Sequence, residues 1–394
     1  MSSRPVQNQK KSGFRRITRR RFIKDVGAAI ALCSLAPHSV SFGSNKKGTL
    51  NYVVMSEEPH LDPHIHTGTA QREMKGQILN GLFTFDENGD PIPELVESYG
   101  NPDPATLILN LRKGVRFHDG VEFSSEDVKF NLERILNPKV GATFHADFLS
   151  AINEIKIVDK YKIEIKLKQP FAPLITELAM PECKIVPKHW MLEKERNINF
   201  ELMGTGPFKL VHREPGVKTV VVKNENYFKK GLPRLNEIHF HRILSGEART
   251  AALKSGSVDM ISYLPRKDIA YFKNNPGFGT ALAQGAYQLI WYNVSKPPFN
   301  DPRVRQAVSY AYDREVLVQT GFFGYGEPMY GVPIPKDSYW YDKKMDSYFR
   351  YDLEKAKGLL AEAGYPKGFE FELLTYMGFD DHKNTGIVAE ASLK

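Results

Sequence analysis

The sequence predicts a mixed α/β protein built from more than one lobe. Strand-like and helix-like patterns alternate along the whole chain, which is typical of α/β folds. Once an N-terminal export signal is set aside, about 350 residues remain, and a chain of that length is expected to form two or three lobes rather than one core. No apolar stretch in that part approaches the roughly 20 residues that a membrane-spanning helix needs.

The first element is an export signal over residues 1–43. Arg19, Arg20 and Arg21 form a twin-arginine run, and a mildly apolar stretch follows at residues 26–35. That stretch is about half as long as a spanning helix, so it predicts a cleaved signal for the twin-arginine (Tat) route rather than an anchor. A basic tail that binds nucleic acid is the alternative, but such a tail does not need an apolar segment behind its arginines.

The signal also accounts for the net charge of the chain. Residues 1–43 contain nine Lys or Arg and one Asp, and the net charge of the full chain is +8. The remaining residues therefore hold 45 basic and 45 acidic groups and are neutral overall. Because the high pI reports only the signal, we expect no nucleic-acid partner.

The two cysteines predict a protein without internal disulfides. Cys33 lies in the signal, and Leu32 before it is larger than the residue that a lipoprotein cleavage site prefers. Cys183 is alone in the mature chain, so it has no partner there even in an oxidising compartment. We expect Cys183 to be a buried small hydrophobe rather than a reactive thiol.

Seven segments have the pattern of strands. The clearest runs over residues 162–168, where Ile163, Ile165 and Leu167 alternate with charged residues. The others cover residues 50–55, 107–111, 208–210, 218–223, 237–244 and 258–262. In the segment at 237–244 we expect His239 and His241 to lie on the outer face of the strand.

Four helices are marked by their ends as well as by their apolar stripes. Ser124 caps a helix with Asp127 as its reciprocal partner, and Asn137 before a proline ends that helix. Further helices are predicted over residues 248–255, from Asp301 to residue 311, and over residues 351–363, where Gly364 follows the last turn. Turns are predicted at residues 118–120 and 204–207.

Five blocks of residues, in this order and spacing, resemble one protein family. They lie at residues 61–64, 109–128, 204–208, 253–259 and 298–314. The chain resembles the extracytoplasmic solute-binding proteins of peptide-type ABC importers, the oligopeptide- and dipeptide-binding group known as solute-binding family 5. The resemblance runs from about residue 49 to the last residue. Each block alone encodes turns and packing, so the signal is their combination.

The resemblance implies a periplasmic-binding-protein-like class II three-domain clamp that shuts over its ligand. Domain I would comprise residues 44–80 and 189–288, domain II residues 81–188, and domain III residues 289–394. Family members extend well beyond residue 394, so we expect this chain to be C-terminally truncated. The acidic residue that pairs with a peptide's amino group in relatives would lie in the missing part, and no position is transferred for it.

The implied function is that of a periplasmic substrate-binding component of an ABC importer. It would capture peptides or similar small solutes by hinged lobe closure and deliver them to permease subunits in the inner membrane. We expect a monomer without a cofactor. A member of the family that binds nickel or a metal chelate is the alternative. An enzyme, such as a periplasmic hydrolase, is disfavoured because no nucleophile, zinc-helix or phosphate-loop motif occurs.

Candidate ligand contacts fall at three places that the resemblance puts at lobe edges. The first corresponds to a ligand-pairing strand in relatives, the second follows the strand at 258–262, and the third contains aromatic residues at the crossing into domain III. For the aromatic residues, packing at a hinge is an equally good reading. The candidates are Thr67, Gly68, Thr69, Ser262, Tyr263, Tyr287, Trp291 and Tyr292.

Two other groups of polar residues are weighed as ligand anchors. Arg303 and Arg305 have the chemistry to bind a carboxylate, but they belong to a block shared across the family whatever the ligand, so a structural role is preferred. His60, His64 and His66 alternate and would share one face of a strand. Since the proline at 63 disrupts a strand and His64 belongs to the family's turn pattern, these three are weak metal candidates.

Overall fold

The computed structural model describes residues 48–55, 61–65, 69–142, 147, 149–194, 198, 201–282, 287–334, 336, 338, 340–375 and 379–394. All of them belong to one compact unit, Asn45–Lys394. Within this described part, no helix is long and apolar enough to cross a membrane. The export signal, Cys33 and the candidates His60, His66, Thr67 and Gly68 lie outside the described residues.

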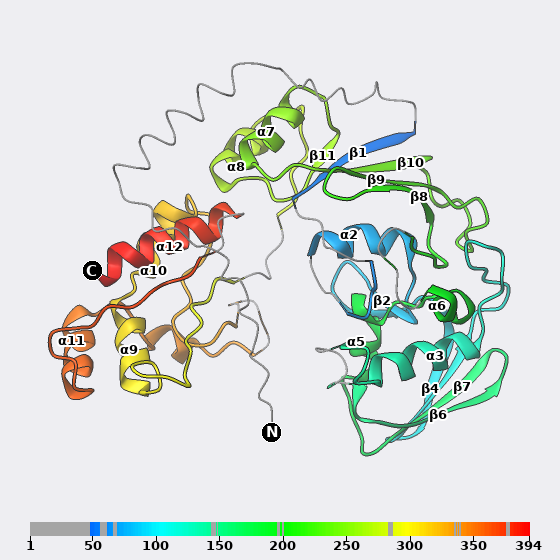
Figure 1. The fold of residues 1–394 in the computed structure, drawn as a ribbon, viewed down its shortest axis with the longest axis horizontal. Coiled ribbons are helices and arrows are strands. Elements are labelled where there is room, and N and C mark those ends of the chain that lie inside the picture. The colour runs from blue at the N-terminus through cyan, green and yellow to red at the C-terminus, as the bar shows by residue number, and fades with distance from the viewer. Residues whose placement is uncertain are drawn as a thin grey trace, which may run out of the picture. The chain divides into compact units, whose positions relative to one another are not determined.

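A five-stranded sheet in the order β11-β1-β10-β9-β8 joins segments far apart in the sequence (Figure 1). Strand β1 (Thr49–Val54) pairs in parallel with β10 (Glu237–Arg242) on one side and with β11 (Met260–Ile261) on the other. Strand β9 (Lys218–Lys223) is antiparallel to both β10 and β8 (Phe208–Glu214). All five strands fall on predicted segments, although β11 is shorter and β8 longer than expected.

A second, antiparallel sheet has the order β4-β5-β7-β6. Its strands are β4 (Val96–Asp103), β5 (Thr106–Leu111), β7 (Lys162–Leu167) and β6 (Ile152–Asp159). The short pair β2 (Phe83–Phe85) and β3 (Pro91–Pro93) stands beside it. Helix α3 (Ser125–Leu136) begins with the predicted capping box, in which the Ser124 amide donates to Asp127 Oδ2 at 3.0 Å.

The remaining helices include α9, which occupies the predicted range. Helix α2, directly before the second sheet, was not predicted from the sequence. The bounds are α2 (Thr69–Ile78), α5 (Leu174–Ala179), α6 (Lys188–Lys194), α7 (Gly246–Lys254), α8 (Ile269–Lys273), α9 (Pro302–Ala311), α10 (Arg314–Val316), α11 (Leu353–Glu362) and α12 (Asp380–Leu393), with shorter turns η1 (Pro181–Cys183), η2 (Arg266–Asp268), η3 (Leu317–Gly321) and η4 (Lys343–Ser347).

The buried apolar side chains form three clusters. The first contains residues between 82 and 185, around the four-stranded sheet. The second draws on residues 54–79 and 186–240, around the five-stranded sheet. The third lies between residues 312 and 389. The chain passes from the second cluster to the first between Leu79 and Leu82, and returns between Ile185 and Val186.

Two expectations about single side chains have different outcomes. Cys183 is buried, as predicted, and burial raises the pKa of its thiol. His241 is not on an outer face: only 8% of it is exposed, and its Nε2 lies 3.1 Å from Asn51 Oδ1 on β1. The prediction failed because β10 lies between β1 and β9, where both faces of a sheet can be covered.

A buried ion pair connects the first two clusters. Arg134, on α3, places Nη2 at 2.5 Å from Asp62 Oδ2 and Nη1 at 3.1 Å from Asp62 Oδ1. Both side chains are almost fully buried. Lys75, on α2, donates to the carbonyl oxygen of Asp62 at 2.8 Å. Although burial opposes it, Arg134 holds the pKa of Asp62 below its ordinary value.

His64 completes this cluster in its neutral form. Its Nδ1 lies 2.7 Å from Arg134 Nη1, which can only donate, so Nδ1 accepts. The proton must then be on Nε2, which donates to the Lys184 carbonyl at 3.0 Å. Burial lowers the pKa of His64 to about 4, which agrees with a neutral imidazole beside a guanidinium.

A second buried carboxylate, that of Glu94, lies where the chain crosses between the first two clusters. Glu94 accepts from Asn80 Nδ2 and the Gly81 amide, each at 2.8 Å, and from Lys184 Nζ at 3.1 Å and Lys229 Nζ at 3.4 Å. Burial opposes the ionised form, but the two lysines and the amide hold the pKa of Glu94 below its usual value. The Glu94 carboxylate therefore stays charged. It connects residues 80–81, at the first chain crossing between the clusters, to Lys184, at the second.

We predict that Arg134→Met lowers the free energy of unfolding by about 3–5 kcal/mol, because it leaves the Asp62 carboxylate buried without its partner charge. Urea titration would measure the change. Lys129→Met, on the same helix, removes an exposed pair with Glu133 and should cost less than about 0.5 kcal/mol. A loss below 1 kcal/mol in Arg134→Met would show that the pair does not hold the two clusters together.

We also predict a loss of stability between about pH 6.5 and pH 4. Burial lowers the pKa of His64, His118 and His241 to about 4, whereas an unfolded histidine titrates near pH 6.5. In that window the unfolded chain binds protons that the folded chain cannot, so stability falls as the pH falls. For fully buried His64 the loss reaches about 3 kcal/mol.

The measurement is the free energy of unfolding at pH 7, 5.5 and 4.5. His118→Gln should make the decline less steep, because the variant removes one of the three histidines whose pKa is lowered. His212→Gln is the matched control, since His212 is exposed on β8. Equal slopes in all three proteins would contradict the assignment.

Candidate functional site

The carboxyl ends of β1 and β11 form the candidate site. Ligands of open α/β sheets bind beyond the carboxyl ends of parallel strands, and these two strands are parallel neighbours (Figure 1). Ser262, the first residue after β11, donates its amide to the Val53 carbonyl at 2.9 Å and its hydroxyl to the same oxygen at 3.3 Å. The predicted contact Ser262 is therefore tied to the end of β1.

Tyr263, the next predicted contact, has a strained backbone. Its φ of 53° lies in the left-handed region, which costs a bulky residue about 1–2 kcal/mol. Its carbonyl accepts from Arg249 Nη2 at 2.9 Å, and its ring packs edge-on against Phe379 at 5.6 Å between centroids. The side chain stays 41% exposed. Strain of this kind is concentrated at functional sites.

Two arginines hold the turn that contains Tyr263. Arg249, on α7, also donates to the carbonyls of Ile243 and Leu244, just after β10. Arg266 contacts Asp381 of α12 at 2.9 Å and donates to the Tyr325 carbonyl at 2.7 Å. These bonds position the ends of β10 and β11 and fasten the turn to the C-terminal helix.

Tyr52 and Glu73 lie at the same strand ends, and sequence reasoning missed both. Tyr52, on β1, interacts through its hydroxyl with the Glu73 carboxyl of α2 and with Ser262. Burial raises the pKa of each group, and the neighbouring carboxyl adds to the shift of Tyr52. Oxygen Oε2 of Glu73 is enclosed and has no hydrogen-bond partner. No local sequence pattern marks Glu73, because α2 is mostly polar and was not predicted as a helix.

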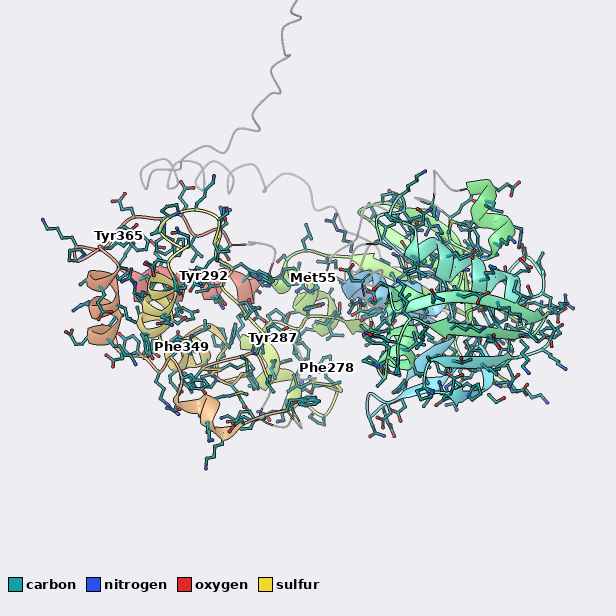
Figure 2. All side chains as sticks on the ribbon, turned by 90° about the horizontal axis from the view of Figure 1, so that it is seen from below. Met55, Phe278, Tyr287, Tyr292, Phe349 and Tyr365 are labelled. Atoms are coloured by element: carbon teal, nitrogen blue, oxygen red, sulfur yellow. The ribbon has the colours of Figure 1, made fainter. Side chains whose placement is uncertain are left out.

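The three predicted aromatic contacts differ from one another. Trp291 is 87% exposed and Tyr287 is half exposed. Tyr292 instead packs on Phe299 at 5.2 Å between ring centroids and lies beside α9 (Figure 2). Among the described residues, no hydrogen bond or ring contact joins these three aromatics to Ser262 or Tyr263. The packing alternative therefore describes Tyr292 well and Trp291 poorly.

The remaining predicted site residues have local structural partners or lie at a helix start. Thr69 is the first residue of α2. Arg303 pairs with Asp301 and donates to the Glu362 carbonyl, and Arg305 donates to the Phe299 and Asn300 carbonyls. Both arginines therefore have the structural role that was preferred for them.

The metal candidates gain no geometric support among the described residues. Both ring nitrogens of His64 are engaged by Arg134 and the Lys184 carbonyl. No group of three or more His, Cys, Asp or Glu side chains suited to a metal ion occurs in the described part of the chain.

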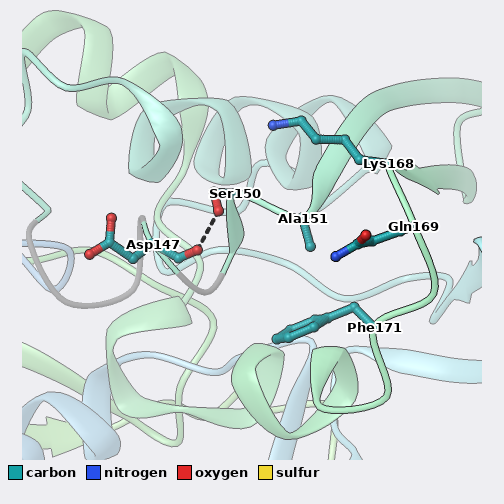
Figure 3. A pocket seen from close by; sticks show the side chains of 6 residues that line it. All are labelled: Asp147, Ser150, Ala151, Lys168, Gln169 and Phe171. Atoms are coloured by element: carbon teal, nitrogen blue, oxygen red, sulfur yellow. Dashed lines mark hydrogen bonds between the residues drawn. The ribbon is translucent and has the colours of Figure 1, made fainter.

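A cavity of about 450 Å³ lies elsewhere, at the ends of β6 and β7 (Figure 3). Its wall contains an alkyl-ammonium chain, an amide and an aromatic ring, together with a hydrogen bond from Ser150 to the Asp147 carbonyl. The lining residues are Asp147, Ser150, Ala151, Lys168, Gln169 and Phe171. This cavity belongs to the four-stranded sheet and contains none of the predicted ligand contacts.

Comparison with known proteins gives a consistent result. The profile of the bacterial extracellular solute-binding proteins, family 5 (middle region), matches residues 90–394. The glutathione-binding protein GsiB of Salmonella choleraesuis is 31% identical over 348 residues, which cover 87% of this chain and 67% of that relative.

Solved structures of similar proteins have the same fold. The binding protein AgaA from A. tumefacien, in complex with agropinic acid, is 37% identical with a TM-score of 0.80, covering 88% of this chain and 70% of the other. DppA from Helicobacter pylori, an ABC transporter-associated periplasmic binding protein in complex with a peptide, is 25% identical with a TM-score of 0.78, covering 88% and 71%. The chain belongs to the family 5 bacterial extracellular solute-binding proteins.

Proposed function

We propose that this protein is the periplasmic receptor of an ABC importer, capturing peptides or similar small solutes at the carboxyl ends of β1 and β11. The observation that carries the proposal is the group of polar and aromatic side chains gathered there, in a chain of the solute-binding family. Relatives bind glutathione, a peptide and agropinic acid.

The topology suits an extended peptide. Strand β11 is an edge of the five-stranded sheet, and an edge strand offers unpaired backbone N–H and C=O groups. A peptide that adds as a strand satisfies its main chain there, so affinity depends little on its side chains. Met260, on β11, is 48% exposed.

The proposed domains follow the clusters of buried side chains. Domain I would comprise residues 44–80 and 189–288, domain II residues 81–188, and domain III the residues from 289. The change of apolar cluster at residues 79–82 and 185–186 supports the first two boundaries. We further propose hinged closure over the ligand, delivery to permease subunits, a monomeric state, and export by the Tat route through residues 1–43.

We predict that di- to pentapeptides and glutathione stabilise the full chain against heat. A ligand at 100 times its Kd adds about 2.7 kcal/mol to the free energy of unfolding, which a melting curve detects. Mass spectrometry of the same samples should show every ligand intact, since no bond is made or broken. A panel without any stabilising member, or with consumed ligand, would contradict the receptor function.

We predict that Tyr263→Gly stabilises the fold and weakens binding together. Glycine removes the cost of the left-handed backbone, which should raise the free energy of unfolding by up to about 1 kcal/mol, while the exposed ring is lost from the ligand. Titration calorimetry with the best ligand of the panel should show a Kd about tenfold higher. Phe349→Gly is the control at another left-handed position (φ 36°) and should leave the Kd unchanged. An unaltered Kd in Tyr263→Gly would remove Tyr263 from the site.

A further inference from the structure

Three polar side chains from three separate elements form a hydrogen-bond relay at the candidate site. The Tyr52 hydroxyl, on β1, is hydrogen-bonded to the Glu73 carboxyl of α2 and to the side chain of Ser262, just after β11. The Tyr52 ring packs against Phe240 of β10 at 5.6 Å between centroids. The Ser262 hydroxyl also lies 3.3 Å from the Val53 carbonyl, to which it can donate. Glu73 therefore acts on the predicted ligand contact Ser262 through Tyr52.

The direction of the hydrogen bonds in the relay depends on the charge of Glu73. An ionised carboxylate can only accept, so the single hydroxyl hydrogen of Tyr52 is directed to Glu73. Burial and the neighbouring carboxyl raise the pKa of Tyr52 above its ordinary value, so the phenol keeps that hydrogen. Ser262 then receives no hydrogen from Tyr52, and its Oγ can accept from an N–H group of a ligand.

A proton on Glu73 reverses the relay. Oxygen Oε2 is enclosed and has no hydrogen-bond partner among the described residues, so a proton there would be a buried donor without an acceptor. The favourable position for the proton is Oε1, from which it is donated to the Tyr52 oxygen. Tyr52 then directs its own hydrogen to Ser262, whose hydroxyl donates to the Val53 carbonyl. In this state the Ser262 hydroxyl is engaged as both donor and acceptor, which makes it a poorer partner for a ligand.

The surroundings of Glu73 make its protonation a local event. Burial raises the pKa of Glu73, and Tyr52 is the one other titratable side chain of the described part that acts on it. In the turn after β11, Tyr263 acts on Tyr52. The basic side chains on α2 and on the adjacent strand β8 have other partners: Arg72 binds Glu182, Lys75 the Asp62 carbonyl and Lys209 the His118 carbonyl.

We propose that Glu73 is a positioning residue of the ligand site, whose ionised form turns the Tyr52 hydroxyl away from Ser262 and leaves Ser262 Oγ free to accept from an N–H group of the ligand. This inference rests on the proposed receptor function and adds a dependence of ligand affinity on pH. Affinity is highest while Glu73 is ionised and falls as the pH falls through its raised pKa. Neither Glu73 nor Tyr52 needs to touch the ligand. The alternative is that the two residues only join α2 to the sheet.

The test uses the full chain and two probes, glutathione and the tetrapeptide Ser-Thr-Ser-Ala, whose terminal amino and carboxyl groups stay charged between pH 5.0 and pH 6.5. Titration calorimetry gives the Kd at both pH values, and the readout is their ratio. The wild type should bind about threefold or more weakly at pH 5.0, because a proton on Glu73 competes with the ligand. In Tyr52→Phe and Glu73→Gln the ratio should fall to about 1, since phenylalanine has no hydroxyl and glutamine does not titrate. Glu193→Gln, an exposed site on α6, is the matched control and should keep the wild-type ratio.

If Glu73 and Tyr52 are purely structural, both variants will keep the wild-type ratio whatever their stability, and that result would overturn the inference but not the receptor function. Measurable binding by the wild type with equal Kd values at the two pH values would have the same meaning. Binding of neither probe by the wild type would overturn both. If Tyr52→Phe or Glu73→Gln does not fold, Ser262→Ala decides, because it removes the acceptor that the relay controls and should also lose the dependence on pH. A wild-type ratio in Ser262→Ala would overturn the inference.

Discussion

The structure depends on one buried ion pair, between Asp62 in the turn after β1 and Arg134 on α3. Two charges out of water persist only where other groups bond to them, and the surrounding residues supply several such bonds, although Nε of Arg134 has no hydrogen-bond partner among the described residues. His64 accepts from the guanidinium and must therefore be neutral, and Lys75 binds the Asp62 carbonyl. The pair joins the cluster around the five-stranded sheet to the cluster around the four-stranded sheet. Residues 61–65, which lie between β1 and α2 in the sequence, are thereby tied to α3.

This ion pair also bears on the strand ends, where Oε2 of Glu73 has no hydrogen-bond partner among the described residues. Asp62 and Glu94 lie where the chain crosses between the first two clusters. Arginine and lysine neutralise both carboxylates, so these side chains serve the fold and are not available to a ligand. Two nearby features are energetically unfavourable when considered alone. They are the buried Oε2 of Glu73, which has no hydrogen-bond partner among the described residues, and the left-handed backbone of Tyr263. A rigid neighbourhood can retain such residues, because the energy that they cost is offset by the packing and ion pairs next to them.

Elements set by local patterns were predictable, and contacts between distant residues were not. The capping box of α3, the start of α9 at Pro302 and the alternation of β9 are each encoded within a few residues, and the structure has all three where the sequence predicts them. Arg134 and Asp62 are 72 positions apart, and nothing near either residue marks its partner. His241 was misplaced for the same reason, since its burial depends on β1, which lies almost 200 residues earlier. At the candidate site, Ser262 and Tyr263 were found through the strand before them, whereas Glu73 lies on a helix that the sequence did not predict.

Backbone groups and charged side chains at a binding site affect ligand binding in different ways. Backbone groups at the edge strand β11 can pair with any extended main chain, so they give affinity without distinguishing one side chain from another. A single charged group at one end of that edge behaves differently, because it fixes the direction in which a ligand lies and rejects a like charge at that end. Asp62 and Glu94 cannot be that group, because Arg134, Lys184 and Lys229 already neutralise them.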